Sequence, residues 1–155
     1  MKDRDLTKAS TGGGADPDDL AERLRLALVP LMRQLRRQGE TPVPTGSLSA
    51  LAALDRHGEM SAGELARHEY VTGPMVTRMA KLLEEEGFIT RSPSPDDGRV
   101  ALLRATAKGR RLVHRRRLAK NEWLRGQLAA LEPGDLAALA AAIPVIERIS
   151  GREVP

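Results

Sequence analysis

A group of polar and cationic side chains between Thr72 and Lys81 has the residue types that contact nucleic acid. Arg can donate paired hydrogen bonds to a guanine edge, Thr and Met can contact a thymine methyl group, and Lys can bind a phosphate. The N-terminal part of a recognition helix is the part that enters the major groove of DNA. A solvated amphipathic helix would show the same pattern, so this segment alone leaves both interpretations open. The candidate DNA-contacting residues are Thr72, Pro74, Met75, Thr77, Arg78 and Lys81.

A second candidate site lies in the polar loop between two short predicted strands, at 88–91 and 100–103. Arg99 follows Asp97 by two residues, and a carboxylate at this spacing can hold a guanidinium in one pose. An Arg held at the tip of a loop suits the narrow minor groove of DNA. This ribbon, with Arg99 as the minor-groove residue and Asp97 as its brace, favours the DNA-binding interpretation.

Two predicted helices position the first group of side chains. Ser61 and Glu64 have the spacing of a capping box, which marks the start of the first helix. Residues 70–71 form the predicted turn, and the side chain of Thr72 is expected to cap the second helix. Gly87 supplies a left-handed stop for that helix. Its buried face is predicted from apolar residues at helical spacing, which are Val76, Met79, Ala80 and Leu83.

Three further segments complete the N-terminal half of the chain. A helix predicted at 16–38 carries a Leu stripe and contains Pro30, which we expect to kink it. A second helix is predicted at 45–57, directly before the helix pair. Met60 is a candidate for a short third strand beside the ribbon.

The C-terminal half is predicted to be helical. Thr106 is expected to cap a long helix, whose only Trp, Trp123, is expected to pack in a core. Pro133 begins a last helix that reaches residue 150 and contains Pro144. The first half of the long helix is strongly basic, and such a run is normally a solvated face. Its cations are Lys108, Arg110, Arg111, Arg115, Arg116, Arg117 and Lys120.

Much of the chain resembles the MarR family of bacterial winged-helix regulators, above all in the segment VTGPMVTRMAKLLEEEGFITRSPSPDDGRVALLRATAKGRRL. The family motifs are a Pro-containing start of the recognition helix, T/S-R, L-E-x-x-G, a D-x-R wing and T-x-x-G. Two residues depart from the usual helix-turn-helix pattern, because Glu69 stands at a commonly apolar position and Tyr70 at a common Gly position. The counterparts of the motifs are Thr72 to Pro74, Thr77 with Arg78, Leu83 to Gly87, Asp97 to Arg99, and Thr106 to Gly109.

The resemblance implies a mainly α fold, namely a winged helix-turn-helix with a small antiparallel β wing and N- and C-terminal dimerisation helices. We expect a disordered tail at 1–15 and one MarR-type domain at 16–150. Within this domain, the DNA-binding winged helix is expected at 45–106 and the dimerisation helices at 16–38 and 106–150.

The resemblance also implies a function. We expect a homodimer that binds a pseudo-palindromic operator in double-stranded DNA, with its recognition helices about 34 Å apart. Such a regulator is expected to repress transcription until a small-molecule effector relieves the repression. The sequence assigns no residues to an effector pocket.

Composition narrows the classes of protein that the chain can belong to. Residues 61–120 carry 13 Lys or Arg against 7 Asp or Glu, whereas the rest of the chain carries 12 against 14. A basic middle on an otherwise balanced chain suits a polyanionic partner. The chain has no Cys, which excludes disulfides, thiolate zinc sites and a cysteine redox sensor.

Several other functions lack their sequence signals. No apolar run approaches the roughly 18 residues of a membrane span, so we expect a cytoplasmic protein that does not interact with membranes. The His residues are scattered, and the motifs G-x-S-x-G, H-E-x-x-H and a phosphate-binding glycine loop are missing. We therefore expect no metal, no cofactor and no catalytic residues.

Two alternative functions remain at this point. The polar helix face could dock a protein partner, as in an interaction module without direct operator readout, with Pro74 and Met75 as apolar anchors. The chain could also be a small-molecule sensor or enzyme subunit that carries a vestigial DNA-binding module. Binding to DNA that weakens steeply as the salt concentration rises would argue against the protein-docking alternative. Titration against the protein's own promoter region would test the vestigial-module alternative.

Overall fold

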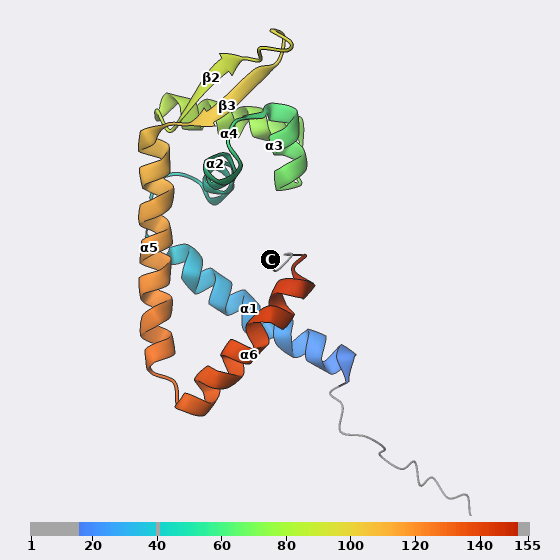
Figure 1. Cartoon of the computed structure of the whole chain (residues 1–155), viewed down its shortest axis with the longest axis vertical. Coiled ribbons are helices and arrows are strands. Elements are labelled where there is room, and N and C mark those ends of the chain that lie inside the picture. Colours follow the sequence, from blue (N-terminus) through green and yellow to red (C-terminus); the bar gives the residue numbers. More distant parts are fainter. Residues whose placement is uncertain (1–15, 40, 152–155) are drawn as a thin grey trace, which may run out of the picture. The chain divides into compact units, whose positions relative to one another are not determined.

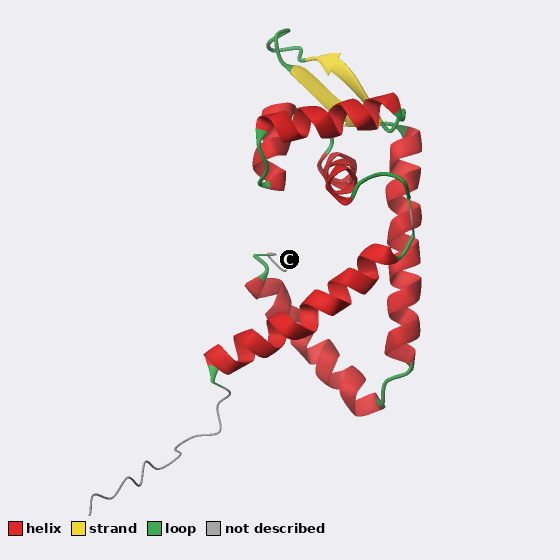
Figure 2. Ribbon diagram, turned by 180° about the vertical axis from the view of Figure 1, so that it is seen from behind, coloured by secondary structure: helices red, strands yellow, loops and turns green. Residues whose placement is uncertain are grey.

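The computed structural model describes residues 16–39 and 41–151 (Figures 1 and 2). The expected disordered tail at 1–15 lies outside the described residues. The chain divides into two compact units, with the boundary between Gln34 and Leu35. The predicted mainly α fold with a small antiparallel sheet is confirmed. The elements are α1 (Pro17–Arg37), α2 (Thr45–His57), β1 (Met60–Ser61), α3 (Ala62–Glu69), α4 (Gly73–Glu85), β2 (Ile89–Pro93), β3 (Ala101–Ala105), α5 (Ala107–Ala129) and α6 (Pro133–Ile149).

The first unit consists mainly of α1. Its start is stabilised by the Asp16 carboxylate, which accepts a hydrogen bond from the backbone N–H of Asp18 at 3.2 Å. Pro17 occupies the first helical position, where its missing N–H would have no partner in the helix. The helix continues through Pro30 and ends at Arg37. None of its residues is buried, and the large apolar side chains exposed on it are Leu20, Leu26, Val29, Leu31 and Met32.

The second unit contains a hydrophobic core enclosed by α2, α3, α4, the sheet and the first half of α5. The sheet is antiparallel, with the strand order β1-β3-β2. Figure 1 shows β2 and β3 as a ribbon next to α4, with α5 beginning where β3 ends. The largest fully buried side chains are Leu51, Leu65, Val76, Leu83, Ile89 and Leu103.

The β ribbon is longer than predicted. The strands predicted at 88–91 and 100–103 each begin one residue early and end two residues early. Pairing extends to Pro93 opposite Ala101, and the backbone N–H of Ser94 donates to the carbonyl of Val100 at 2.8 Å. The turn between the strands is therefore tighter than the polar sequence suggests. The predicted strand at Met60 is confirmed, since it pairs with β3.

Two of the side-chain caps predicted from the sequence, at the starts of α3 and α5, are confirmed. At α3 the predicted capping box is confirmed, since the backbone N–H of Glu64 donates to Ser61 Oγ and the Glu64 carboxylate accepts from the backbone N–H of Ser61. The hydrogen bonds from the Ser61 backbone and then from its hydroxyl lower the pKa of Glu64. At α5, Thr106 Oγ1 accepts from the backbone N–H of Gly109 at 3.1 Å, which confirms the predicted cap.

The predicted side-chain cap of α4 is wrong. Thr72 occupies the N-cap position, but its side chain makes no capping hydrogen bond. One of the two N–H groups that such a cap would use is missing, because Pro74 has none. The other, on Met75, donates to the backbone carbonyl of Thr72 at 3.0 Å.

The C-terminal helices extend beyond this core. Gly109 and Leu112 of α5 are buried, but the second half of the helix has no buried residue. Trp123 is partly exposed and does not belong to the buried core, so its predicted core role is wrong for the single chain. α6 contains Pro144 and likewise has no buried residue. No helix in the described ranges is long and apolar enough to cross a membrane.

We predict that Gly109→Ala lowers the free energy of unfolding by about 1–3 kcal/mol, because overpacked sites must shift their neighbours. A Cβ at this position would stand 2.2 Å from the Phe88 carbonyl oxygen, which is backbone and cannot rotate away. Gly126→Ala is the matched control in the same helix, since its Cβ would meet nothing within 4 Å. Chemical denaturation should show a loss for Gly109→Ala alone, and equal midpoints for both variants would contradict the prediction.

Candidate nucleic-acid interface

The polar face of α4 gathers all of the residues that the sequence singles out on this helix. The buried stripe of Val76, Met79, Ala80 and Leu83 faces the core, as predicted. The candidate DNA-contacting residues lie on the solvent-facing side, where Met75 is 43% exposed. The exposed candidates on α4 and at its start are Thr72, Pro74, Met75, Thr77, Arg78 and Lys81.

These side chains differ in how free they are to bind a partner. The Thr77 hydroxyl donates a hydrogen bond to the Gly73 carbonyl at 3.1 Å, so its oxygen remains available as an acceptor. The Lys81 Nζ lies 3.8 Å from a Glu85 carboxylate oxygen in an exposed pair. Arg78 makes no hydrogen bond or ion pair within the described part of the chain. All of its donors are therefore available to a base edge or a phosphate.

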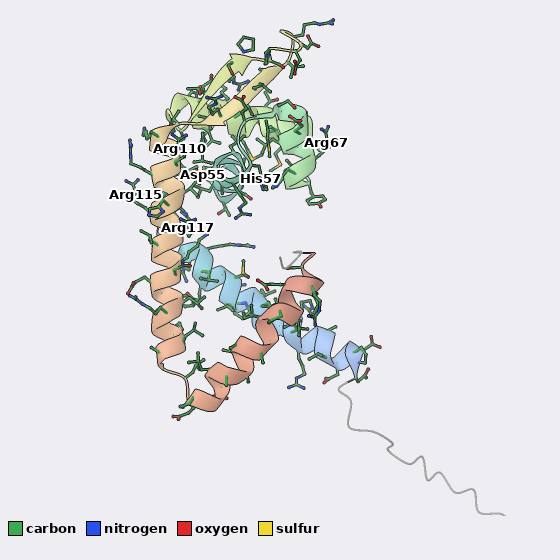
Figure 3. All side chains as sticks on the ribbon, in the orientation of Figure 1. Asp55, His57, Arg67, Arg110, Arg115 and Arg117 are labelled. Atoms are coloured by element: carbon green, nitrogen blue, oxygen red, sulfur yellow. The ribbon has the colours of Figure 1, made fainter. Side chains whose placement is uncertain are left out.

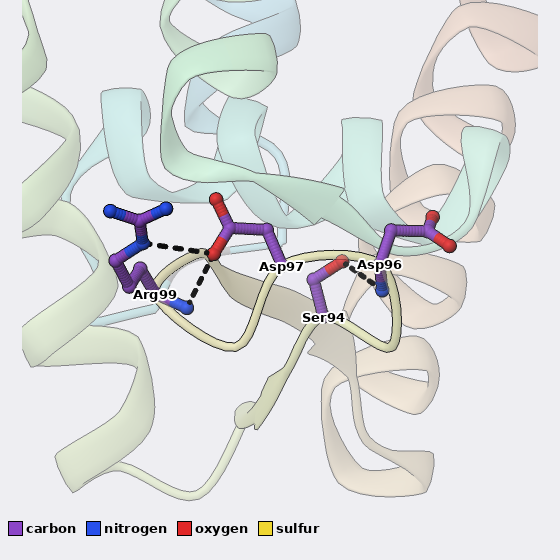
Figure 4. A network of polar contacts seen from close by, with 4 residues as sticks. All are labelled: Ser94, Asp96, Asp97 and Arg99. Carbon is purple, nitrogen blue, oxygen red and sulfur yellow. Dashed lines mark hydrogen bonds and ion pairs between the residues drawn. The ribbon is translucent and has the colours of Figure 1, made fainter.

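The wing places one cation at its tip. Arg99 is 93% exposed in its side chain, and its Nε lies 3.3 Å from Asp97 Oδ1. The same carboxylate oxygen accepts the backbone N–H of Arg99 at 3.0 Å, while the backbone N–H of Asp96 donates to Ser94 Oγ (Figure 4). Asp97 therefore restrains both the loop backbone and the guanidinium, which is the geometry expected from the spacing of the two residues.

Two ion pairs that connect the sheet to neighbouring segments were not predicted. Arg91 on β2 donates from Nε to a Glu84 carboxylate oxygen of α4 at 2.7 Å. Arg104 on β3 donates to Glu59, which precedes β1, also at 2.7 Å. The first pair joins residues seven positions apart and the second joins residues 45 apart. The partners of each pair lie on different elements, so spacing within one helix could not have predicted these ion pairs. The alternation of side chains along the strands was the only available signal.

The turn between α3 and α4 has an unusual conformation at Tyr70. This residue has φ 54 and ψ 41, which is the left-handed region, and it is 96% exposed. A bulky residue rarely adopts this conformation, so the departure from Gly noted in the sequence corresponds to real backbone strain. The side chain of the neighbouring Glu69 contacts His68: its Oε1 lies 3.1 Å from His68 Nδ1. The His68 ring in turn packs near the His57 ring, with centroids 4.8 Å apart.

The basic run of α5 has partly structural roles. Lys108 Nζ donates to the Glu86 carbonyl at the end of α4, and Arg110 donates to the Ala105 carbonyl at the end of β3. Figure 3 shows Arg110, Arg115 and Arg117 along the first half of this helix. Arg117 contacts His114 Nδ1 at 3.1 Å. Several of these cations therefore bind backbone carbonyls or a neighbouring ring, which indicates a structural role for this part of α5.

Comparison with known proteins identifies the family. The model of the MarR family matches residues 45–101, which contain α4 and most of the wing. An uncharacterised HTH-type transcriptional regulator of Mycobacterium bovis is 43% identical over 113 residues, which cover 72% of this chain and 79% of that protein. The chain belongs to the MarR family. MarR-family proteins are DNA-binding transcriptional regulators, and the family model covers the chain from α2 to the first residue of β3.

Solved structures confirm the winged helix-turn-helix fold of this MarR-family chain. A crystal structure from Pseudomonas aeruginosa, assigned to a transcriptional regulator protein, is 32% identical with a TM-score of 0.78. It covers 89% of this chain and 99% of that one. BpsR of Bordetella bronchiseptica, whose DNA binding is regulated by 6-hydroxynicotinic acid, shares the fold at 17% identity and a TM-score of 0.56. That match covers 90% of this chain and 98% of BpsR.

We predict that Tyr70→Asn raises the free energy of unfolding by about 1 kcal/mol, because Asn tolerates the left-handed conformation better than Tyr does. Tyr70→Ala is the control, since it removes the exposed ring without adding the short polar side chain through which Asn tolerates this conformation. Thermal or chemical denaturation of the two variants separates loss of strain from loss of the ring. Equal stability of both variants and the parent chain would show that the turn stores no strain.

Proposed function

We propose that this MarR-family chain is a homodimeric transcriptional repressor that binds a pseudo-palindromic operator and is released by a small-molecule effector. The observation that carries the proposal is the unpaired Arg78 on the exposed face of α4, which has no competing acceptor among the described residues. A dimer that occupies successive major grooves would exclude other proteins from the same DNA, and this favours repression.

We assign the DNA contacts residue by residue. Arg78 would donate to base edges in the major groove, with Thr72, Pro74, Met75 and Thr77 against neighbouring bases. Lys81 would exchange Glu85 for a phosphate, because its exposed ion pair is weak. Arg99 would enter the minor groove, with Asp97 as its brace.

The dimerisation helices are proposed from their exposed apolar side chains. α6 buries none of its residues in the single chain, although most of its residues are apolar. Surfaces of this kind on a small protein mark interaction sites, and a second copy is the partner that a pseudo-palindromic operator requires. α1 has exposed apolar residues of its own. The side chains of α6 that would be covered are Leu136, Leu139, Ile143, Val145 and Ile149.

A small anion is the effector class that the structure supports. An open pocket of about 580 Å³ lies between the end of α1, the following loop, α2 and α5. Arg36 and Arg116 line it, and its described lining contains no acidic residue. Burial, followed by the charges of Arg116 and Arg36, lowers the pKa of the nearby Lys120. A bound carboxylate would offset this repulsion, and the regulation of BpsR by an acid is consistent with an effector of this class.

The remaining expectations follow from regulation of DNA. We infer that the chain acts in the cytoplasm, where bacterial DNA lies, and that it is not an enzyme. The support for the second inference is that its relatives are transcriptional regulators. A protein-docking role for the α4 face is the competing function, and the salt dependence of DNA binding separates the two.

We predict that Arg78→Ala weakens binding to the preferred duplex by roughly 1–3 kcal/mol and binding to random DNA much less, because base readout is lost. The duplex is obtained by selection from a random-sequence library, and affinity is measured by fluorescence anisotropy. Arg67→Ala on α3 is a control with the same change of charge outside the α4 face. An equal loss on specific and random DNA would contradict the assignment of Arg78 to a base.

We predict that Arg99→Ala weakens specific and random binding alike, because the wing contacts the backbone and groove rather than one base. The slope of log affinity against log salt should become shallower by about one unit per subunit. Asp97→Ala should show a weaker form of the same defect, since the guanidinium remains without its brace. Tighter binding by Asp97→Ala would mean that Asp97 only repels phosphate.

We predict that Ile143→Asp converts the dimer to a folded monomer. Ile143 is 50% exposed in the single chain, so a charge there costs the monomer little but would be unpaired inside a dimer. Ser150→Asp adds the same charge just beyond the end of α6 and is the control. Sedimentation at micromolar concentration with circular dichroism would check both states. A parent chain that sediments as a monomer would disprove the dimer.

A further inference from the structure

The Glu84–Arg91 ion pair joins α4, to which the proposed function assigns the major-groove contacts, to the strand that leads to the wing loop carrying Arg99. Glu84 belongs to the last turn of α4 and Arg91 is the third residue of β2. Their oxygen and Nε atoms are 2.7 Å apart, which is a charge-assisted hydrogen bond. Within the described residues, no other ion pair connects α4 to the ribbon.

The pattern of the two elements explains why these residues meet. Side chains alternate along a strand, so Arg91 shares the core-facing side of the ribbon with the buried Ile89. Its partner across the ladder, Leu103, is also buried. On α4, Glu84 follows the buried Ala80 by one helical turn, which places it at the edge of the buried stripe. The pair therefore stands where the apolar core between α4 and the ribbon ends.

Beyond this point the ribbon has little packing to fix its direction. Ile89 is the only buried residue of β2, and every residue from Thr90 to Pro93 is exposed. The strand advances about 3.3 Å per residue, so a small rotation at Arg91 becomes a larger displacement at the tip. Arg99 lies in the loop at that tip, so such a rotation would displace it relative to α4.

We propose that Glu84 is a positioning residue for the wing: it holds Arg91 and thereby fixes the direction of the ribbon relative to α4. With the ribbon fixed, Arg78 and Arg99 meet the major and minor grooves at the same time. Glu84 itself does not contact DNA. The proposal rests on the proposed function, because it concerns the distance between two DNA-contacting arginines.

A second ion pair on the same sheet provides the matched control. Glu59 and Arg104 are also 2.7 Å apart, and the side chains in both pairs are partly exposed. Glu59 precedes β1, however, so its pair ties β3 to β1 and has no part in α4. Loss of this pair removes a comparable interaction without affecting the angle between the ribbon and α4.

The experiment compares Glu84→Gln with Glu59→Gln on the duplex selected from a random library. Exposed pairs contribute little to folding, so both variants should keep the unfolding midpoint of the parent. Glu84→Gln should weaken DNA binding by about three- to tenfold, a loss that corresponds to the coupling energy of one contacting pair. Glu59→Gln should change the affinity for DNA by no more than about twofold. Hydroxyl-radical footprinting should show loss of minor-groove protection at the wing position for Glu84→Gln alone.

Double variants distinguish positioning from a direct or purely structural role. In the Glu84→Gln background, Arg99→Ala should cost less than in the parent, because a misdirected wing already loses the Arg99 contact. Arg91→Gln combined with Glu84→Gln should bind no more weakly than Glu84→Gln, since the two residues act as one pair.

The outcomes separate this proposal from the proposed function. Additive effects of Glu84→Gln and Arg99→Ala, equal effects of Glu84→Gln and Glu59→Gln, or tighter binding by Glu84→Gln would each overturn the positioning role. In all of these cases the parent chain would still bind DNA and Arg99→Ala would still weaken it, so the proposed function would stand. A parent chain that selects no sequence would overturn both.

Discussion

The close approach of α5 to the end of α4 and the start of β2 is the constraint on which the winged helix depends. Gly109 has no Cβ, which lets the helix pass directly against the Phe88 carbonyl. The Thr106 hydroxyl reaches the carbonyls of Gly87 and Phe88 at the same junction, and the backbone N–H of Thr106 also donates to Phe88. Two segments about twenty residues apart are thus fixed at backbone distance. This contact fixes where β2 begins and where α5 passes the end of α4.

The cations of the molecule fall into groups that differ in what already neutralises them. Arg78 has no partner in the described structure, and Arg99 shares a carboxylate that also holds its own backbone. Lys81 has a distant acidic neighbour, whereas Arg91 is held tightly. The net charge of the chain does not show which cations are free and which are already paired. A free cation is available to a ligand immediately, but a tightly paired one is more useful for holding two elements together.

The features that are encoded locally could be predicted from the sequence. The buried stripe of α4, the capping box at Ser61 and the brace between Asp97 and Arg99 all depend on residues within a few positions of one another. Features that depend on the backbone chemistry of a neighbouring residue, or on a distant segment, could not be predicted from the sequence. Pro74 removes a donor that the Thr72 cap would use, and the partner of Arg104 lies 45 residues away. The roles of the site residues toward DNA remain predictions.

The scarcity of aromatic residues has a consequence for observing this protein. The chain has one Trp, one Tyr and one Phe, and each lies in a different part of the fold. Phe88 is buried in the core, Tyr70 is fully exposed at the turn before α4, and Trp123 is partly exposed on the second half of α5. Intrinsic fluorescence excited at the red edge of the absorption band therefore comes from one site on one helix. The protein carries its own single-site optical reporter for the half of α5 that lies outside the core.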